Sequence, residues 1–333
     1  MKMFGALPRA CVSLCAYHSC MLRSRTVVRN FARVTTVAMS TTATNQGPLV
    51  SCQWLREQQA APDGPTVKPI DASWYLPAMK RDGFAEFIET HIPSAAFFDV
   101  DATDDTSNLP HMLPSADFFA KTMTACGVTN ADHVVVYDGK GLFSAARLWW
   151  MLRAYGHERV SVLDGGLPAW VAEGFPTESG PAAEPAAGAA FAATLQPGAT
   201  ADAAELLAHV SAPGPLLIVD ARSKERFEGT VAEARPGCRS GHIPTSVSVP
   251  FNLLLEASGK MKSDEKLLGV FSAAGVALDA AGPPLVTSCG SGVTAAVVQL
   301  ALAKLGRVDR ISLYDGSWAE WGGDEAKPLA TGP

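Results

Sequence analysis

The chain has 333 residues, of which 47% are hydrophobic and 18% charged, and its formal net charge is −6. That length accommodates two domains of ordinary size. The acidic balance argues against nucleic acid or an anionic membrane surface as the main partner. No stretch reaches the roughly 20 apolar residues that a membrane-spanning helix requires.

Residues 1–46 differ in composition from the rest of the chain. They carry six basic residues and no Asp or Glu; without them, 21 Lys and Arg face 33 Asp and Glu, a net charge of −12. An Arg-rich, Ser/Thr-rich and acid-free leader is typical of a mitochondrial transit peptide. A secretory signal is the alternative, but Arg9 and His18 interrupt the apolar stretch that it would need. We expect mitochondrial import, and Met39 offers a second start that would yield a cytosolic form.

An internal repeat organises the body of the chain. The segment HIPSAAFFDV at 91–100 matches HIPTSVSVPF at 242–251, and VSVLDGGLPAW at 160–170 matches ISLYDGSWAEW at 311–321. Both matches have the same offset of 151 residues, which indicates a tandem duplication. We expect one copy over 47–175, a Pro/Ala-rich linker or surface wrap over 176–200, and a second copy over 201–328.

Each copy shows the alternating pattern of a parallel α/β sheet. In the first copy, 134–137 predicts a buried strand and 142–156 a helix. In the second copy, 215–221 and 284–288 predict strands, and 293–306 predicts a helix that ends near Gly306. The predicted fold is therefore α/β, with two domains that each have a mostly parallel central sheet flanked by helices.

Cysteine usage indicates a reducing compartment. Three of the seven cysteines lie in the leader, and Cys52, Cys126, Cys238 and Cys289 are widely separated in the body, without a Cys-x-x-Cys motif. This is neither a zinc-site spacing nor a disulfide framework. We expect free thiols and neither a metal nor an organic cofactor.

Cys289 follows the predicted strand 284–288 and opens the loop CGSGVT before a predicted helix. The thiolate, which is the nucleophilic form, is a minor species for a thiol of pKa about 8.5 at neutral pH, and the start of a helix favours an anion. Gly290 and Gly292 let backbone N–H groups point at one anion, either a thiolate or a persulfide. The repeat places Asp138 at the corresponding position of the first copy, so we expect the second copy to be reactive and the first to be a scaffold.

Cys289 has two other possible interpretations. A small buried residue at a strand end is the usual role of a free cysteine, but the Gly-x-Gly loop and the repeat favour a reactive thiol. Cysteine phosphatases need an arginine six residues after the cysteine to hold the phosphoryl oxygens. Ala295 stands at that position, which excludes this class.

The tandem copies, the HIP and DGGLPAW/DGSWAEW segments and the CGSGVT loop together resemble the rhodanese superfamily of sulfurtransferases, over about residues 50–325. Thiosulfate-using members carry basic residues just after the cysteine. Here Gly290 and Ser291 are neutral, and the loop is similar to that of the mercaptopyruvate branch. The resemblance implies a persulfide on Cys289, formed with release of pyruvate, in a site on the second domain that faces the first across a cleft.

The resemblance also implies roles for other residues. Ser291 relays a proton with Asp101 and His111 of the first copy, although the segment that holds this pair is one residue shorter than usual and Asp99, Asp104 and Asp105 are nearby. Arg226 and Arg235 bind the carboxylate and keto oxygen, which suits planar guanidinium groups. The substrate-binding residues expected from the second copy are Arg226, Arg235, Gly290, Gly292, Val293 and Thr294. His242 and Asp220, whose types recur as His91 and Asp71, are interpreted as structural.

The acceptors that the resemblance implies are thioredoxin, small thiols or cyanide, with hydrogen sulfide released when a thiol reduces the persulfide. Two alternatives stay open. Thiosulfate could be the donor, or the chain could be a rhodanese-like binding or regulatory module without turnover. The sequence does not indicate the oligomeric state.

Overall fold

The structure is a computed structural model that describes residues 46–61, 66–184, 190–279 and 281–333. The expected leader therefore lies outside the described residues, apart from its last position. Within the described ranges, no helix has both the length and the hydrophobicity to cross a membrane.

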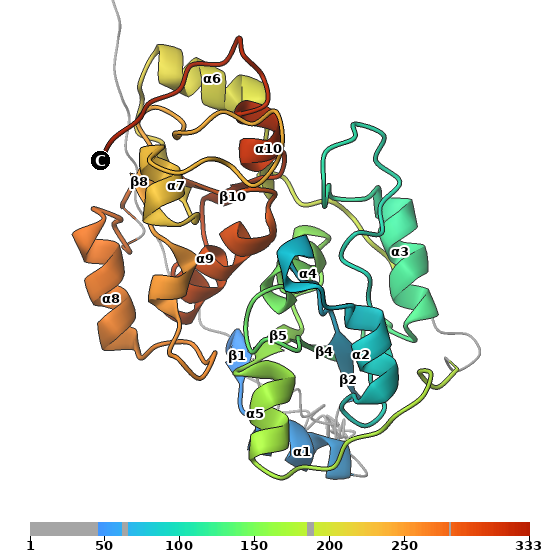
Figure 1. Cartoon of the computed structure of the whole chain (residues 1–333). Coiled ribbons are helices and arrows are strands. Elements are labelled where there is room, and N and C mark those ends of the chain that lie inside the picture. The colour runs from blue at the N-terminus through green and yellow to red at the C-terminus, as the bar shows by residue number, and fades with distance from the viewer. Residues whose placement is uncertain (1–45, 62–65, 185–189, 280) are drawn as a thin grey trace, which may run out of the picture. The chain divides into compact units, whose positions relative to one another are not determined.

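Two five-stranded sheets form the centre of the described chain (Figure 1). The first domain has the strand order β1-β5-β4-β2-β3 and the second has β6-β10-β9-β7-β8, so each strand of one sheet has its counterpart five strands later. All pairings within both sheets are parallel, which confirms the predicted fold class. The strands are β1 Leu49–Val50, β2 Val67–Asp71, β3 Ala96–Phe97, β4 His133–Tyr137, β5 Val160–Leu163, β6 Thr200–Ala201, β7 Leu217–Asp220, β8 Val247–Ser248, β9 Leu285–Ser288 and β10 Ile311–Tyr314.

Helices connect the parallel strands, and several begin at a capping side chain. Ser51, Asp82, Ser115, Asp202 and Ser223 each accept a backbone N–H in the first helical turn, which satisfies a donor that the helix leaves free. The first domain contains α1 Cys52–Ala60, η1 Pro77–Met79, α2 Gly83–Glu89, α3 Ala116–Ala125, α4 Ala145–Ala154 and α5 Gly166–Ala172. The second contains α6 Ala203–Ser211, α7 Lys224–Glu228, η2 Phe251–Leu254, α8 Asp264–Ala273, α9 Val293–Lys304 and α10 Ser317–Trp321.

Helices α4 and α9 occupy corresponding places in the repeat and pack against each other. Almost every residue of α4 is buried, because one face covers its own sheet and another contacts the second domain. The core formed here is continuous between the domains and includes Trp149, Trp150 and Leu300. Helix α4 begins at 145, three residues after the predicted start, because residues 139–144 form a loop instead.

The described part of the segment between the copies lies along the first domain as a surface wrap. Phe191 is buried against Phe119, and the backbone N–H of Gln196 donates to the carbonyl of Ala154. The segment then leads into β6 at Thr200.

The two domains exchange the same kind of contact at equivalent positions. Asp164, after β5, accepts the backbone N–H of Met261 from the second domain at 2.7 Å. Asp315, after β10, accepts the backbone N–H of Leu113 from the first domain at 2.6 Å. These two aspartates are the repeat partners in the DGG and DGS segments, so the contact between the domains has approximate two-fold symmetry.

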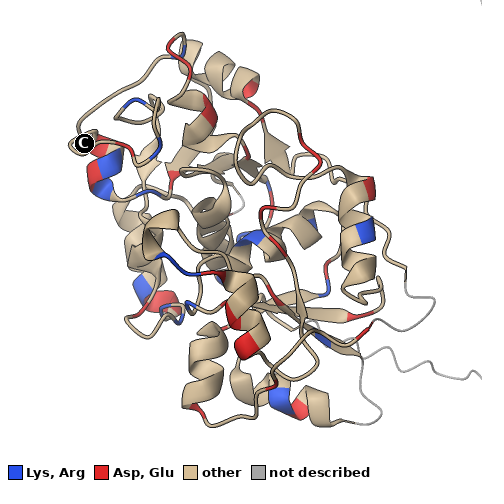
Figure 2. Ribbon diagram, turned by 45° about the vertical axis from the view of Figure 1, so that its right-hand side comes forward, with Lys and Arg blue, Asp and Glu red and all other residues tan. Residues whose placement is uncertain are grey.

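Charged residues are spread over both domains. In the view of Figure 2, acidic and basic residues are interspersed along the described elements. Exposed pairs such as Lys266–Glu256, at 2.8 Å, bring opposite charges together. Pairs of this kind contribute little to stability, typically about 0–1 kcal/mol.

Candidate functional site

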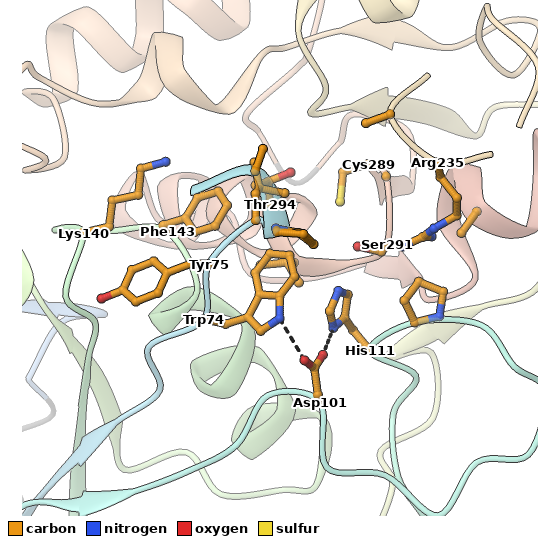
Figure 3. Close-up of a pocket in the computed structure, with 18 of the residues that line it drawn as sticks. Trp74, Tyr75, Asp101, His111, Lys140, Phe143, Arg235, Cys289, Ser291 and Thr294 are labelled. Carbon is orange, nitrogen blue, oxygen red and sulfur yellow. Dashed lines mark hydrogen bonds and ion pairs between the residues drawn. The ribbon is translucent and has the colours of Figure 1, made fainter. Parts of the chain in front are cut away.

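A cavity of about 1060 Å³ is lined by residues of both domains. Nine of the ten predicted site residues line it: Asp101, His111, Arg226, Arg235, Cys289, Gly290, Ser291, Val293 and Thr294. Figure 3 shows Cys289 and Ser291 on one side of the cavity and Asp101 and His111 on the other, with Ser291 lying between Cys289 and His111 in this view. The structure therefore brings together groups that are almost 200 residues apart in sequence.

Cys289 is positioned by the end of β9 and by α10. Its residue is 2% exposed, its N–H donates to Ser317 Oγ at 3.3 Å, and its carbonyl accepts the N–H of Trp318 at 3.0 Å. The loop then leads directly into α9 at Val293. The sulfur is thus held at the carboxyl edge of the sheet, beside the beginning of a helix, where backbone N–H groups are free to meet an anion.

Gly292 is the predicted site residue that does not line the cavity. It lies behind the loop with φ +80°, and a Cβ at this position would be 2.8 Å from Nη1 of Arg147. Both facts require glycine, because an L side chain rarely adopts this φ and would collide with the guanidinium. Its role in the loop is conformational.

Asp138 shows what the corresponding loop holds in the first domain. The Asp138 carbonyl accepts the N–H of Leu167 at 3.0 Å, the repeat counterpart of the bond from Trp318 to Cys289. The buried carboxylate of Asp138 accepts five backbone N–H groups at 2.7–3.0 Å, from Lys140, Gly141, Phe143, Ser144 and Ala145. The first domain therefore fills its own anion-binding loop with a side chain.

Asp101 and His111 contact each other. Asp101 Oδ1 lies 2.5 Å from His111 Nδ1, and Trp74 Nε1 donates to Asp101 Oδ2 at 3.0 Å (Figure 3). Partial burial raises the pKa of Asp101, but the hydrogen bond and charge of His111 and the bond from Trp74 outweigh it, so this pKa lies below its ordinary value. Asp101 is therefore anionic at neutral pH and holds the ring of His111.

The neighbouring aspartates have other partners. Asp99 accepts the N–H of Asp101, Asp104 binds Ser115, and Asp105 binds Ser107. The shorter segment nevertheless presents His111 to the cavity, because this residue has a φ of +57°. Positive φ is unusual for a residue other than glycine and is often found at functional sites.

The two predicted arginines differ in their surroundings. Arg226 binds the buried carboxylate of Glu233, with Nη2 at 2.5 Å from Oε2, and its guanidinium lies next to Gly290. Arg235 is exposed, lines the same cavity and has no ion pair among the described residues. Arg226 is thus fixed beside the sulfur loop, and Arg235 is available for a carboxylate.

A chain of buried charges supports Arg226. Glu233 also pairs with Arg222 at 2.9 Å, and Arg222 binds Asp220 at 2.6 Å. The Arg222 guanidinium lies over the Trp318 ring, 4.2 Å from its centroid. Asp220 is therefore linked to the site only through other residues. His242 Nδ1 lies 2.7 Å from the Phe227 carbonyl, and Nδ1 of its repeat partner His91 lies 2.8 Å from the Phe87 carbonyl.

The other body cysteines lie in environments that disfavour a thiolate. Burial raises the pKa of Cys52 to about 11 and that of Cys126 to about 11. Burial also raises the pKa of Cys238, against the opposing charge of Arg235. A protonated thiol is a poor nucleophile.

The sequence did not predict two residues that line the cavity, Trp74 and Glu233, or two that lie behind the sulfur loop, Arg147 and Asp315. Asp315 belongs to a repeated segment, but the sequence does not show that it reaches the other domain. Arg147 was visible as a charged residue within the largely apolar stretch SAARLWWML. Its repeat counterpart is Val298, so the asymmetry between the copies was the available signal.

Comparison with known proteins decides the family. The model of the Rhodanese-like domain matches the chain twice, over residues 58–173 and 202–324. The chain belongs to the rhodanese family. Each rhodanese domain contains one of the two sheets, and the cavity combines residues from both.

Individual rhodanese relatives match over most of their length. A 3-mercaptopyruvate sulfurtransferase of Rattus norvegicus is 46% identical over 82% of this chain and 91% of the relative. The mitochondrial thiosulfate/3-mercaptopyruvate sulfurtransferase 1 of Arabidopsis thaliana is 40% identical over 85% of this chain and 78% of the relative. The crystal structure of SseA from Escherichia coli superposes with a TM-score of 0.71, at 39% identity, over 82% of this chain and 99% of SseA.

Proposed function

We propose that this protein is a sulfurtransferase that moves sulfur from 3-mercaptopyruvate through a persulfide on Cys289 to a thiophilic acceptor. The placement of Cys289 in the glycine loop, opposite the Asp101–His111 pair, carries this proposal. The relatives named as 3-mercaptopyruvate sulfurtransferases, at up to 46% identity, support the donor.

The first half-reaction transfers one sulfur atom. The Cys289 thiolate attacks the sulfur of the substrate, the bond between that sulfur and C3 breaks, and its electron pair becomes the enolate of pyruvate. The sulfur, with its hydrogen, remains on Cys289 as a persulfide. One proton added to C3 completes pyruvate, and in this proposal Ser291 and His111 deliver it.

The charges around the cavity suit this chemistry. Arg235 binds the substrate carboxylate, and Arg226 stabilises the enolate oxygen, for which preorganised donors are effective. Backbone N–H groups of the loop that begins at Cys289 receive the persulfide anion, as those of the first domain receive the carboxylate of Asp138.

In the second half-reaction an acceptor takes the sulfur. An acceptor thiolate, of a small thiol or of thioredoxin, attacks the outer sulfur of the persulfide and regenerates the Cys289 thiolate. A second thiol then forms a disulfide with the acceptor and releases hydrogen sulfide. Cyanide instead takes the sulfur directly as thiocyanate.

Thiosulfate is the second candidate donor. The Arabidopsis relative is named for both donors, whereas the neutral Gly290 and Ser291 offer no cation to a dianion beside Cys289. Intact mass after mixing with each donor separates the two. A gain of one sulfur from 3-mercaptopyruvate, with pyruvate release, and no gain in Cys289→Ser is the expected result. A gain only from thiosulfate would transfer the protein to the sister activity, and no gain from either would leave the binding-module alternative.

The domain boundaries and the cellular localisation follow from the same sequence features. We propose an inactive domain over 47–175, a linker over 176–200 and a catalytic domain over 201–328. The basic leader and the mitochondrial name of the Arabidopsis relative support mitochondrial import of the chain, with a cytosolic form starting at Met39. The N-terminal sequence of the protein purified from each cell fraction tests both forms.

A further inference from the structure

The contact between the two domains contains a fully buried ion pair. Arg147, on α4 of the first domain, places Nη2 2.7 Å from Oδ1 of Asp315, which follows β10 of the second domain. The side chain of Arg147 is 0% exposed and that of Asp315 is 8% exposed. Neither residue lines the cavity, so any effect on the reaction must act through other residues.

On the first-domain side, this pair holds the segment that carries His111. Arg147 Nη2 donates to the backbone carbonyl of His111 at 2.5 Å. Asp315 Oδ2 accepts the backbone N–H of Leu113 at 2.6 Å. His111 itself has the left-handed φ of +57°, so its conformation depends on bonds of this kind.

On the other side, the same pair lies directly against the sulfur loop. A Cβ on Gly292 would be 2.8 Å from Arg147 Nη1 and 3.3 Å from Asp315 Oδ1. The pair therefore contacts both the segment of His111 and the loop of Cys289. The ion pair is therefore placed to set the distance between His111 and the Cys289 loop.

Stability alone does not account for this arrangement. Arg147 Nε and Nη1 are buried and have no hydrogen-bond partner among the described residues, and a buried guanidinium with unfilled donors is costly. Apolar residues of similar volume often replace a buried ion pair without loss of stability. Retention of the charges therefore calls for a function that packing would not fulfil.

The repeat supplies an internal comparison. Asp164, the counterpart of Asp315, also accepts a backbone N–H from the other domain, that of Met261. The counterpart of Arg147 is Val298, so no guanidinium accompanies Asp164 in that way. Of the two equivalent contacts, the ion pair therefore occurs at that of Asp315, which is the contact next to His111 and the Cys289 loop.

We propose that Arg147 and Asp315 form a positioning pair that fixes His111 of the first domain in register with the Cys289 loop of the second. This inference rests on the proposed sulfur transfer as the activity to be measured. The pair acts on the proton-transfer step through His111, while Arg226 and Arg235, both from the second domain, still bind the substrate.

The test removes the charges of Arg147 and Asp315 and keeps a side-chain oxygen at position 315 as a hydrogen-bond acceptor. The double variant Arg147→Met/Asp315→Asn removes the ion pair but leaves an oxygen for the N–H of Leu113. Asp164→Asn is the matched control, because it makes the same change at the equivalent contact. Wild type and variants are compared in kcat and KM for 3-mercaptopyruvate, in the pH profile of kcat and in the urea midpoint of unfolding.

We expect the double variant to fold and to lose about 10- to 100-fold in kcat, with KM within about 2-fold, as for a misplaced catalytic group. The pH profile of its kcat should differ in shape from that of the wild type, which a change in stability alone would not cause. Asp164→Asn should keep kcat within about 2-fold. Equal losses in both variants, or wild-type kcat and pH profile in the double variant, would show that the pair serves only the contact between the domains.

Two further measurements keep the outcome decisive. If the double variant does not fold, Arg147→Lys retains the charge but not the geometry of the guanidinium, and a folded Arg147→Lys with wild-type kcat would overturn the proposal. Absence of turnover in the wild type would instead refute the sulfur transfer itself. In that case the alkylation rate of Cys289, which requires no substrate, can still be compared between the variants. We expect this rate to differ from wild type in the double variant but not in Asp164→Asn. An unchanged rate in both variants would overturn the inference.

Discussion

The replacement of Asp138 by Asn tests whether a side chain holds the loop of the first domain. Its carboxylate is buried and accepts two backbone N–H groups on Oδ1 and three on Oδ2. Asn places an NH₂ group at one of these oxygens, so two or three N–H groups then face a donor. Gly141, within this loop, packs closely against Gly259 of the second domain, so the loop has little room to adjust.

The size of the effect follows from those lost acceptors. A buried donor left without a partner costs about 1–3 kcal/mol, and neighbouring losses are not additive. We therefore expect Asp138→Asn to lower the free energy of unfolding by about 3 kcal/mol. With a urea dependence of about 2 kcal/mol per molar, the midpoint should fall by about 1.5 M.

Urea unfolding followed by tryptophan fluorescence measures this shift, because Trp149 and Trp150 lie on the helix that follows the loop. Asp105→Asn is the control, since Asp105 also accepts a backbone N–H but is exposed, and it should change stability by no more than about 0.5 kcal/mol. If Asp138→Asn lowers the midpoint no further than this control does, the carboxylate does not hold the loop.

Three further predictions concern individual side chains. Glu233→Gln should weaken the hold on Arg226 and lower kcat for 3-mercaptopyruvate about 5- to 10-fold, with less effect on KM, because Arg226 acts on the developing enolate oxygen; a rise in KM with unchanged kcat would contradict this role. Asp101, whose pKa is lowered, keeps its charge above pH 5, so Asp101→Asn should lower kcat about 100-fold at pH 7, and a kcat within about 2-fold of wild type would count against its role. Cys52, with its pKa raised to about 11, should be about 0.1% thiolate at pH 8 and resist iodoacetamide in the folded protein; peptide mass spectrometry after labelling shows whether it reacts.

The repeat made much of the fold accessible from the sequence. Because the strands alternate with helices at a constant offset, the predicted strand over 134–137 and the predicted helix over 293–306 agree with β4 and α9 to within two residues. The predicted start of α4 was three residues early. Asp138 draws the N–H groups of the following residues toward its carboxylate, and this delays the helix. Apolar periodicity does not register such a local competition.

The candidate site divides in the same way. Cys289, Ser291 and the arginines lie in compact segments whose chemistry can be interpreted locally. The Arg147–Asp315 pair joins residues that are 168 apart, and neither segment shows which residue of the other domain it contacts. Only the packing of the two domains gives them a common position, and no pattern within either segment specifies it.

The approximate two-fold symmetry of the domain contact has a consequence for how such a protein can change. Two identical domains, each contacting the other through an aspartate at the position of Asp164 and Asp315, would form an ordinary homodimer with two equivalent sites. Joining them in one chain keeps the partners at a high effective concentration, whatever the amount of protein. Because the two domains of one chain can have different sequences, the contact surface of each domain no longer has to be complementary to an identical copy of itself. One site can then lose its nucleophile while the domain that lost it specialises as a source of acid–base groups for the other.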